Sequence, residues 1–60
     1  MKLTLTLKMG NAAFDDSPAE EVARILHRFA DDIRNHFLEE GDSYPLFDIN
    51  GNKVGVVAIS

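Results

Sequence analysis

The sequence contains no cysteine and only two histidines among its 60 residues. Disulfide bonds are therefore excluded, and no cysteine–histidine cluster is present that could hold structural zinc. A chain of this length buries only about 60% of the surface that its unfolded form exposes, so its core is small. Small domains without such cross-links often gain stability by self-association or by binding a partner. We expect a single domain over residues 1–60.

Long hydrophobic runs are also missing. No stretch approaches the roughly 18 apolar residues that a membrane-spanning helix needs. The first residues, Met1 to Leu5, alternate between apolar and polar and lack the apolar core of a signal peptide. We therefore expect a cytoplasmic protein with no membrane partner.

Basic residues are few. Six Lys and Arg stand against ten Asp and Glu, which gives a net charge of −4 and a pI near 4.8. Binding to DNA or RNA depends on cations that neutralise phosphates, so this composition disfavours a direct nucleic-acid partner. Such binding would need Lys8, Arg24, Arg28 and Lys53 to form one patch, and the expected fold scatters them. An acidic surface is instead attracted to basic grooves on other proteins, although mild acidity also serves solubility.

Residues 2–9 alternate strictly, which predicts a half-buried strand. Its leucines and Met9 fall on one face and its threonines and Lys8 on the other. A helix is predicted from Pro18 to Glu40, because apolar residues recur there at i, i+3 and i+4. Ser17 at the N-cap and Glu20 at N3 match a capping box, and Gly41 matches a C-terminal cap.

Residues 44–49 and 52–59 predict a β-hairpin. Asn50-Gly51 is the preferred pair for a two-residue type I′ turn, which would place Asp48 opposite Lys53 as a charge pair. Pro45 lacks an N–H and therefore belongs on an edge strand. The predicted fold is α+β, with the order strand-helix-strand-strand. The sheet is antiparallel in the order 1-3-2 with the helix on one face; order 1-2-3 with a parallel pair is the alternative.

The predicted register leaves one sheet face without a covering layer. Alternation from the hairpin turn places Phe47, Ile49 and Val54 beneath the helix. The opposite face then carries an apolar set that we interpret as a docking or dimer surface, unless it is simply a mildly apolar back face. This set is Tyr44, Leu46, Val57 and Ile59.

No constellation of residues suggests catalysis, a cofactor or a metal. Asp32, His36 and Glu40 share one helix stripe, but zinc prefers more nitrogen and sulfur ligands. The segment from Asp48 resembles a calcium loop only superficially, because its glycine comes too early and no Glu follows at position 12. We expect a protein that is not an enzyme and uses no cofactor.

Acidic residues outnumber basic ones towards the C-terminal end of the predicted helix. They are the candidate surface for a basic protein partner. The candidates are Asp31, Asp32, Glu39, Glu40 and Asp42.

Three segments of the chain resemble short proteins encoded by bacterial phages, prophages and integrative elements: residues 11–14 (NAAF), 22–26 (VARIL) and 48–55 (DINGNKVG). Such short proteins include anti-CRISPR and other anti-defence inhibitors, which bind a host complex. The resemblance therefore implies a bacterial host cell. It implies no catalytic residue. The expected function is a small acidic inhibitor that occludes a basic, nucleic-acid-binding surface of a host defence complex. The alternative is a homodimeric structural or regulatory module with no inhibitor role.

Overall fold

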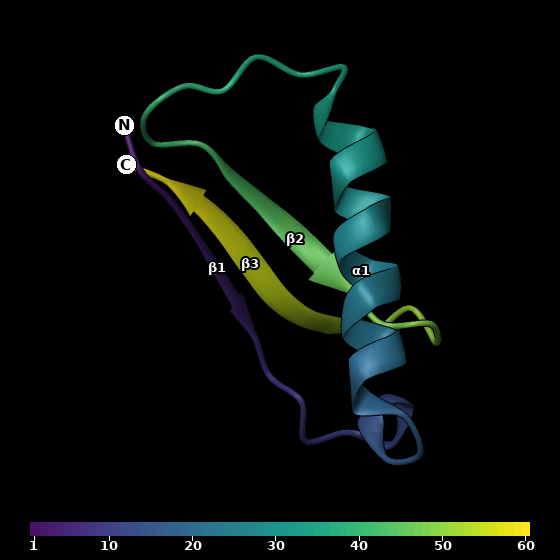
Figure 1. Ribbon diagram of the computed structural model, residues 1–60. Helices are drawn as coiled ribbons and strands as arrows, with labels where there is room; N and C mark the ends of the chain where they lie inside the picture. The colour runs from purple at the N-terminus through teal and green to yellow at the C-terminus, as the bar shows by residue number, and fades with distance from the viewer.

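The computed structural model describes all 60 residues and shows one helix beside a three-stranded sheet (Figure 1). In chain order the elements are β1 (Leu3–Leu7), the short 3₁₀ helix η1 (Ala12–Phe14), α1 (Pro18–Ile33), β2 (Ser43–Phe47) and β3 (Lys53–Ile59). Both strand pairs are antiparallel and the order is β1-β3-β2, so the predicted α+β fold and sheet order are confirmed.

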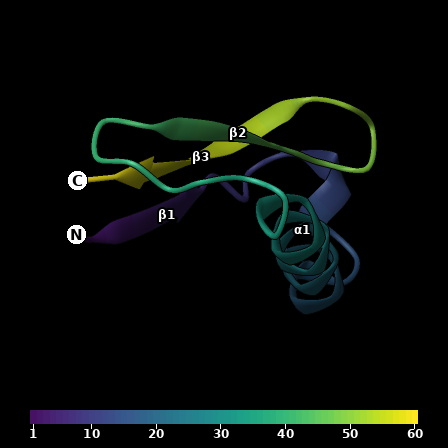
Figure 2. The ribbon, with the colours of Figure 1, turned by 90° about the horizontal axis from the view of Figure 1, so that it is seen from above.

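The helix and the sheet meet at one end and diverge at the other. In Figure 1, α1 crosses close to the β2–β3 connection, and residues 34–42 then run from the far end of α1 back to the start of β2. The view from above also places the hairpin connection on the same side as α1, away from the chain ends (Figure 2). The α1 helix is neither long enough nor apolar enough to cross a membrane.

The helix is shorter than predicted. It begins at Pro18 as expected but ends at Ile33 rather than Glu40. Ile33 is still half-buried, whereas Phe37 is 91% exposed, so the apolar stripe has nothing to pack against beyond Ile33. Acidic residues in the last turn also oppose the helix dipole, and no basic residue offsets them there.

The predicted caps do not form. Ser17 occupies the N-cap, but its side chain makes no capping hydrogen bond. Gly41 has φ +95° and lies eight residues beyond the helix, where its N–H donates to the Ile59 carbonyl at 2.8 Å. The Gly41 conformation therefore directs the chain into the sheet instead of ending α1.

The hairpin connection differs from the predicted type I′ turn. The Gly51 N–H donates to the Asp48 carbonyl at 3.0 Å, and only Gly51 has positive φ in this turn. The loop is thus a type I turn followed by a left-handed glycine, the usual three-residue arrangement. The strands regain register through a bulge, so Lys53 faces Phe47 and the predicted Asp48–Lys53 pair is wrong.

The covered apolar face differs from the predicted one: Val54 is buried as expected, but Phe47 and Ile49 are exposed. Tyr44 pairs with Val57 as expected, but Val57 also pairs with Leu5, so the β1 leucines share a face with Val57 and Leu46. The helix covers this face. Residues at the core are Phe14, Ile25, Leu46, Val54, Val57 and Ile59, with half-buried Tyr44 packed against them. The prediction that Tyr44, Leu46, Val57 and Ile59 form an uncovered surface is therefore wrong.

Candidate functional site

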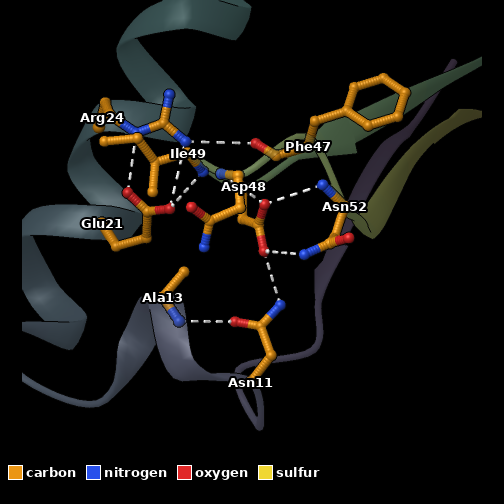
Figure 3. Close-up of polar contacts among 9 residues, drawn as sticks. Asn11, Ala13, Glu21, Arg24, Phe47, Asp48, Ile49 and Asn52 are labelled. Atoms are coloured by element: carbon orange, nitrogen blue, oxygen red, sulfur yellow. Dashed lines mark hydrogen bonds and ion pairs between the residues drawn. The ribbon is translucent and has the colours of Figure 1, made fainter.

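Asp48 is the centre of a buried polar cluster that joins the hairpin turn to the loop after β1 (Figure 3). Its side chain is almost fully buried, with 4% of the residue exposed. The carboxylate accepts hydrogen bonds from the backbone N–H groups of Asn50 and Asn52, both at 2.9 Å, and from the Asn11 Nδ2 at 2.7 Å. Asn11 in turn accepts a hydrogen bond from the Ala13 N–H at 3.0 Å, which fixes the start of η1.

A second carboxylate lies beside this cluster on α1. Glu21 accepts hydrogen bonds from Arg24 Nε at 2.7 Å and from the Ile49 N–H at 2.9 Å. Arg24 continues across to the Phe47 carbonyl at 3.3 Å. The pair therefore ties the helix to the end of β2 and to the first part of the hairpin connection, as the dashed lines in Figure 3 show.

Both carboxylates are stabilised in the charged form. The hydrogen bond from Arg24 lowers the pKa of Glu21 below its ordinary value, against an opposing effect of burial. Burial alone would raise the pKa of Asp48, but the hydrogen bonds from Asn52, Asn11 and Asn50 together lower it. Every buried polar side-chain atom has a partner. This cluster therefore joins three parts of the chain, and none of its buried polar atoms is free to bind a ligand.

The candidate acidic residues lie at the end of α1 and on the segment that follows it. Asp31, Asp32, Glu39 and Glu40 are exposed. Asp42 is half-buried, and its carboxylate accepts a hydrogen bond from the Glu39 N–H at 3.1 Å. The carboxylate of Asp32 pairs with Arg28 at 3.3 Å, on the exposed face of the helix.

This acidic segment, residues 31–42, accounts for the whole net charge of the protein. It contains five acidic residues and one arginine, whereas the rest of the chain has five of each sign and is neutral. It also carries Phe37, the most exposed of the large apolar side chains at 91%, and Leu38, at 38%. A helix that continued to Glu40 would place Phe37 on its apolar stripe, so the exposure of Phe37 follows from the early end of α1.

Tyr44 anchors the acidic segment to the sheet. Its ring lies 5.8 Å from that of His36 and 6.2 Å from that of Phe29, measured between ring centroids. Its hydroxyl is 3.4 Å from the Phe37 carbonyl and 3.5 Å from the Asp42 carboxylate. Burial, together with the Asp42 charge, raises the pKa of Tyr44 above its ordinary value. Tyr44 therefore holds the segment from inside and is not itself a docking residue.

A shallow groove runs between α1 and β2, but it offers no convergent set of reactive groups. Its charged lining residues pair with neighbours along the helix, Arg24 with Glu21 and Arg28 with Asp32. No three His, Asp or Glu side chains come together in a way that could hold a metal ion. The acidic segment is therefore the candidate functional site.

Comparison with known proteins adds no further constraint. No protein-family model, curated protein or solved structure matches the chain.

Proposed function

We propose that the protein is a small inhibitor that binds a protein partner through the acidic segment and occludes a basic, nucleic-acid-binding surface of a host defence complex. A single observation carries the proposal. The entire net charge and the most exposed large apolar side chain, Phe37, fall within the same segment, residues 31–42. Interfaces of this kind combine a buried aromatic anchor with charges that steer the encounter.

The two parts of the segment make different contributions. The carboxylates of Glu39 and Glu40 are exposed and attract a basic surface over several ångströms before contact. Phe37 supplies a short-range contribution, because burying a phenylalanine side chain gains roughly 2–3 kcal/mol. The apolar anchor predicted from the sequence is buried in the core, so Phe37 and its neighbour Leu38 take over that role in the proposal.

The segment is also held in place before binding. The Tyr44 hydroxyl lies 3.4 Å from the Phe37 carbonyl, and the Ile59 N–H donates to the Asp42 carbonyl at 2.9 Å, so both ends of the Phe37–Asp42 stretch contact the sheet. A binding loop that is already ordered loses less conformational entropy on association. Phosphate-bearing ligands fit this surface poorly, because the segment and a nucleic acid carry the same sign of charge.

Capture from a lysate of the bacterial host, with mass spectrometry, tests the proposal. The wild-type protein should retain a nuclease or another nucleic-acid-binding subunit of a defence complex, and it should compete with DNA or RNA for that subunit. The Phe37→Ser variant and the double variant E39K/E40K should each lose most of the captured material.

The matched control is D15K/D16K, which changes the net charge by the same amount at exposed residues outside the segment. It should capture as well as the wild type. Equal loss in this control would show that overall charge and not the acidic segment governs binding. Capture that yields no nucleic-acid-binding protein would contradict the inhibitor function itself.

A further inference from the structure

The outer edge of β1 carries backbone groups that nothing in the molecule binds. Lys2 and Ser60 exchange both of their backbone hydrogen bonds, and the Lys8 N–H donates to the Val54 carbonyl at 2.7 Å. Antiparallel strands alternate between residues that bond to the neighbour and residues that point away. The N–H and C=O groups of three residues therefore face outward from the sheet: Leu3, Leu5 and Leu7.

The other edge of the sheet, formed by β2, is protected against pairing with a further strand, so β1 is the open edge. On β2, Pro45 has no N–H to offer, and Arg24 already binds the Phe47 carbonyl. The bulge at Leu46/Phe47 interrupts that strand pair as well. β1 has neither a proline nor a bulge, and in both ribbon views it lies at the rim of the molecule with β3 on one side only (Figures 1 and 2).

The leucines of β1 are also incompletely covered. Leu3 is 47% exposed, and Leu5 and Leu7 are half-buried, although all three point to the face that packs against α1. A strand added beside β1 would extend this apolar face and shield them. Six residues form the buried core of the molecule, so additional apolar burial at this edge is a substantial gain for so small a domain.

The sequence of β1 indicates what the added strand is. Residues 2–8 read Lys-Leu-Thr-Leu-Thr-Leu-Lys, which is the same in both directions. In an antiparallel pair the second strand runs in the opposite direction. Because the sequence of residues 2–8 is the same in both directions, each residue would face a residue of its own type in a second copy. A two-fold axis through Leu5 would pair Leu5 with its copy, Leu3 with Leu7 of the second copy, and Thr4 with Thr6 of the second copy.

We propose that two copies of this chain associate through β1 and form one continuous antiparallel sheet. The two three-stranded sheets would join as six strands in the order β2-β3-β1-β1-β3-β2, with both helices on the same face. The outward N–H and C=O groups of Leu3, Leu5 and Leu7 become paired across the axis. This association uses a surface separate from the acidic segment and goes beyond the proposed function.

Substitutions at Thr4 and Thr6 test the contact, because both side chains are exposed on the face opposite α1 and leave the core unchanged. In T4K/T6E, the lysine introduced at position 4 would face the glutamate introduced at position 6 of the second copy, twice per dimer. In T4K/T6K, lysines would face one another at the same two places. Cross-strand charge pairs of this kind change the dissociation constant about tenfold in either direction.

Sedimentation equilibrium over a wide concentration range measures the effect. The wild-type mass should rise from 6.7 kDa towards twice that value. T4K/T6E should dimerise at about tenfold lower concentration than the wild type, and T4K/T6K at about tenfold higher concentration. A wild-type protein that stays monomeric at the highest soluble concentration would overturn the proposal, as would a dimer that responds equally to both double variants.

Chemical synthesis allows a second test that does not alter any side chain. N-methylation of Leu5 removes an outward N–H and places a methyl group on the free edge, while the β1–β3 hydrogen bonds remain. The methylated protein should be a folded monomer by circular dichroism and sedimentation. A methylated protein that still dimerises would overturn the contact. If the wild type is monomeric but methylation abolishes capture of a host protein, the edge binds a partner strand and the second-copy proposal is wrong.

The two proposals fail separately. E39K/E40K should lose capture but keep the dimer, whereas T4K/T6K should weaken the dimer but keep capture.

Discussion

Asp48 connects residues that are far apart in the chain through a single carboxylate. Its hydrogen bonds to Asn50 and Asn52 close the hairpin turn, and its hydrogen bond to Asn11 attaches the loop after β1. An aspartate that binds its own backbone two residues ahead favours a type I turn. The Asn-Gly pair alone predicts a type I′ turn. The observed turn type depends on Asp48, which lies outside that pair.

The Asp48→Asn variant should lower the thermal midpoint of unfolding by roughly 10 °C or more, since a buried group then loses its partners. The introduced amide would place an NH₂ group against the donors of Asn11 and Asn52. Differential scanning calorimetry measures the change. Asp15→Asn is the control, because Asp15 is exposed and its side chain makes no hydrogen bond, so its midpoint should equal that of the wild type. Equal midpoints for the two variants would contradict the role of Asp48.

Acid should destabilise the protein through the same cluster. The pKa values of Glu21 and Asp48 are lower in the folded state than their ordinary values of 4.5 and 3.8. Their contribution to stability is therefore complete above those values and is lost as the pH falls through and below them. Urea unfolding followed across this range should show a falling midpoint, with a shallower fall in Asp48→Asn. A midpoint that stays constant on acidification would contradict the assigned pKa directions.

At the level of elements, local sequence patterns predicted the secondary structure and strand order better than they predicted the tertiary packing. Alternation located β1, Pro18 marked the start of α1, and the edge position of Pro45 gave the correct strand order. The covered face was inverted because β1 pairs its leucines with Gly55, Val57 and Ile59, which puts the helix on the face of Val57 and Ile59, whereas the Tyr44–Val57 pair itself was predicted correctly. The end of α1 was missed because amphipathic spacing continues past the point where the sheet underlies the helix.

The acidic surface was predicted in part from the sequence. Asp31, Asp32, Glu39 and Glu40 are exposed as expected, because charge alone places such residues at the surface. Phe37 could not be found in this way, since its exposure follows from the early end of α1. The buried roles of Glu21 and Asp48 were missed as well, because both depend on contacts between distant segments.

The pairing of β1 with β3 sets a strict size limit at Gly55. A Cβ at this position would overlap the Thr6 carbonyl oxygen and lie 2.9 Å from Leu7 Cδ2. Gly55→Ala should therefore destabilise the protein by about 3 kcal/mol, or prevent folding, because strand backbone cannot move aside cheaply. Gly10→Ala is the control: its Cβ has open space, and the change should be neutral or stabilising by about 0.5 kcal/mol. Urea unfolding of both variants checks the prediction, which fails if Gly55→Ala is as stable as Gly10→Ala.

At the start of α1 the predicted capping box and the observed structure give different expectations for Ser17. A capping box would make Ser17→Ala cost about 1 kcal/mol. The Ser17 side chain makes no capping hydrogen bond, so we expect a loss below about 0.5 kcal/mol in urea unfolding. A full 1 kcal/mol loss would show that the cap forms in solution.

For the whole molecule, the distribution of charge gives the two proposed contacts opposite responses to salt. Binding of the acidic segment to a basic surface should weaken as salt rises, because screening removes the attraction. Self-association through β1 should strengthen, because two copies of net charge −4 repel and Lys2 would lie opposite Lys8 of the second copy. Sedimentation and capture measured over the same salt series test both signs, and a dimer that dissociates on adding salt would contradict the β1 arrangement.

The polar cluster lies only at the end of the molecule where α1 meets the hairpin, and this asymmetry has a consequence for hydrogen exchange. The backbone N–H of Ile49 donates to Glu21 of α1, so it can exchange only when the hairpin connection separates from the helix. Its exchange should report global unfolding. Amides at the opposite end, such as Asn35 and His36, need only a local fluctuation. The hairpin end of the molecule should therefore be protected from exchange longest, and the end of α1 should exchange first.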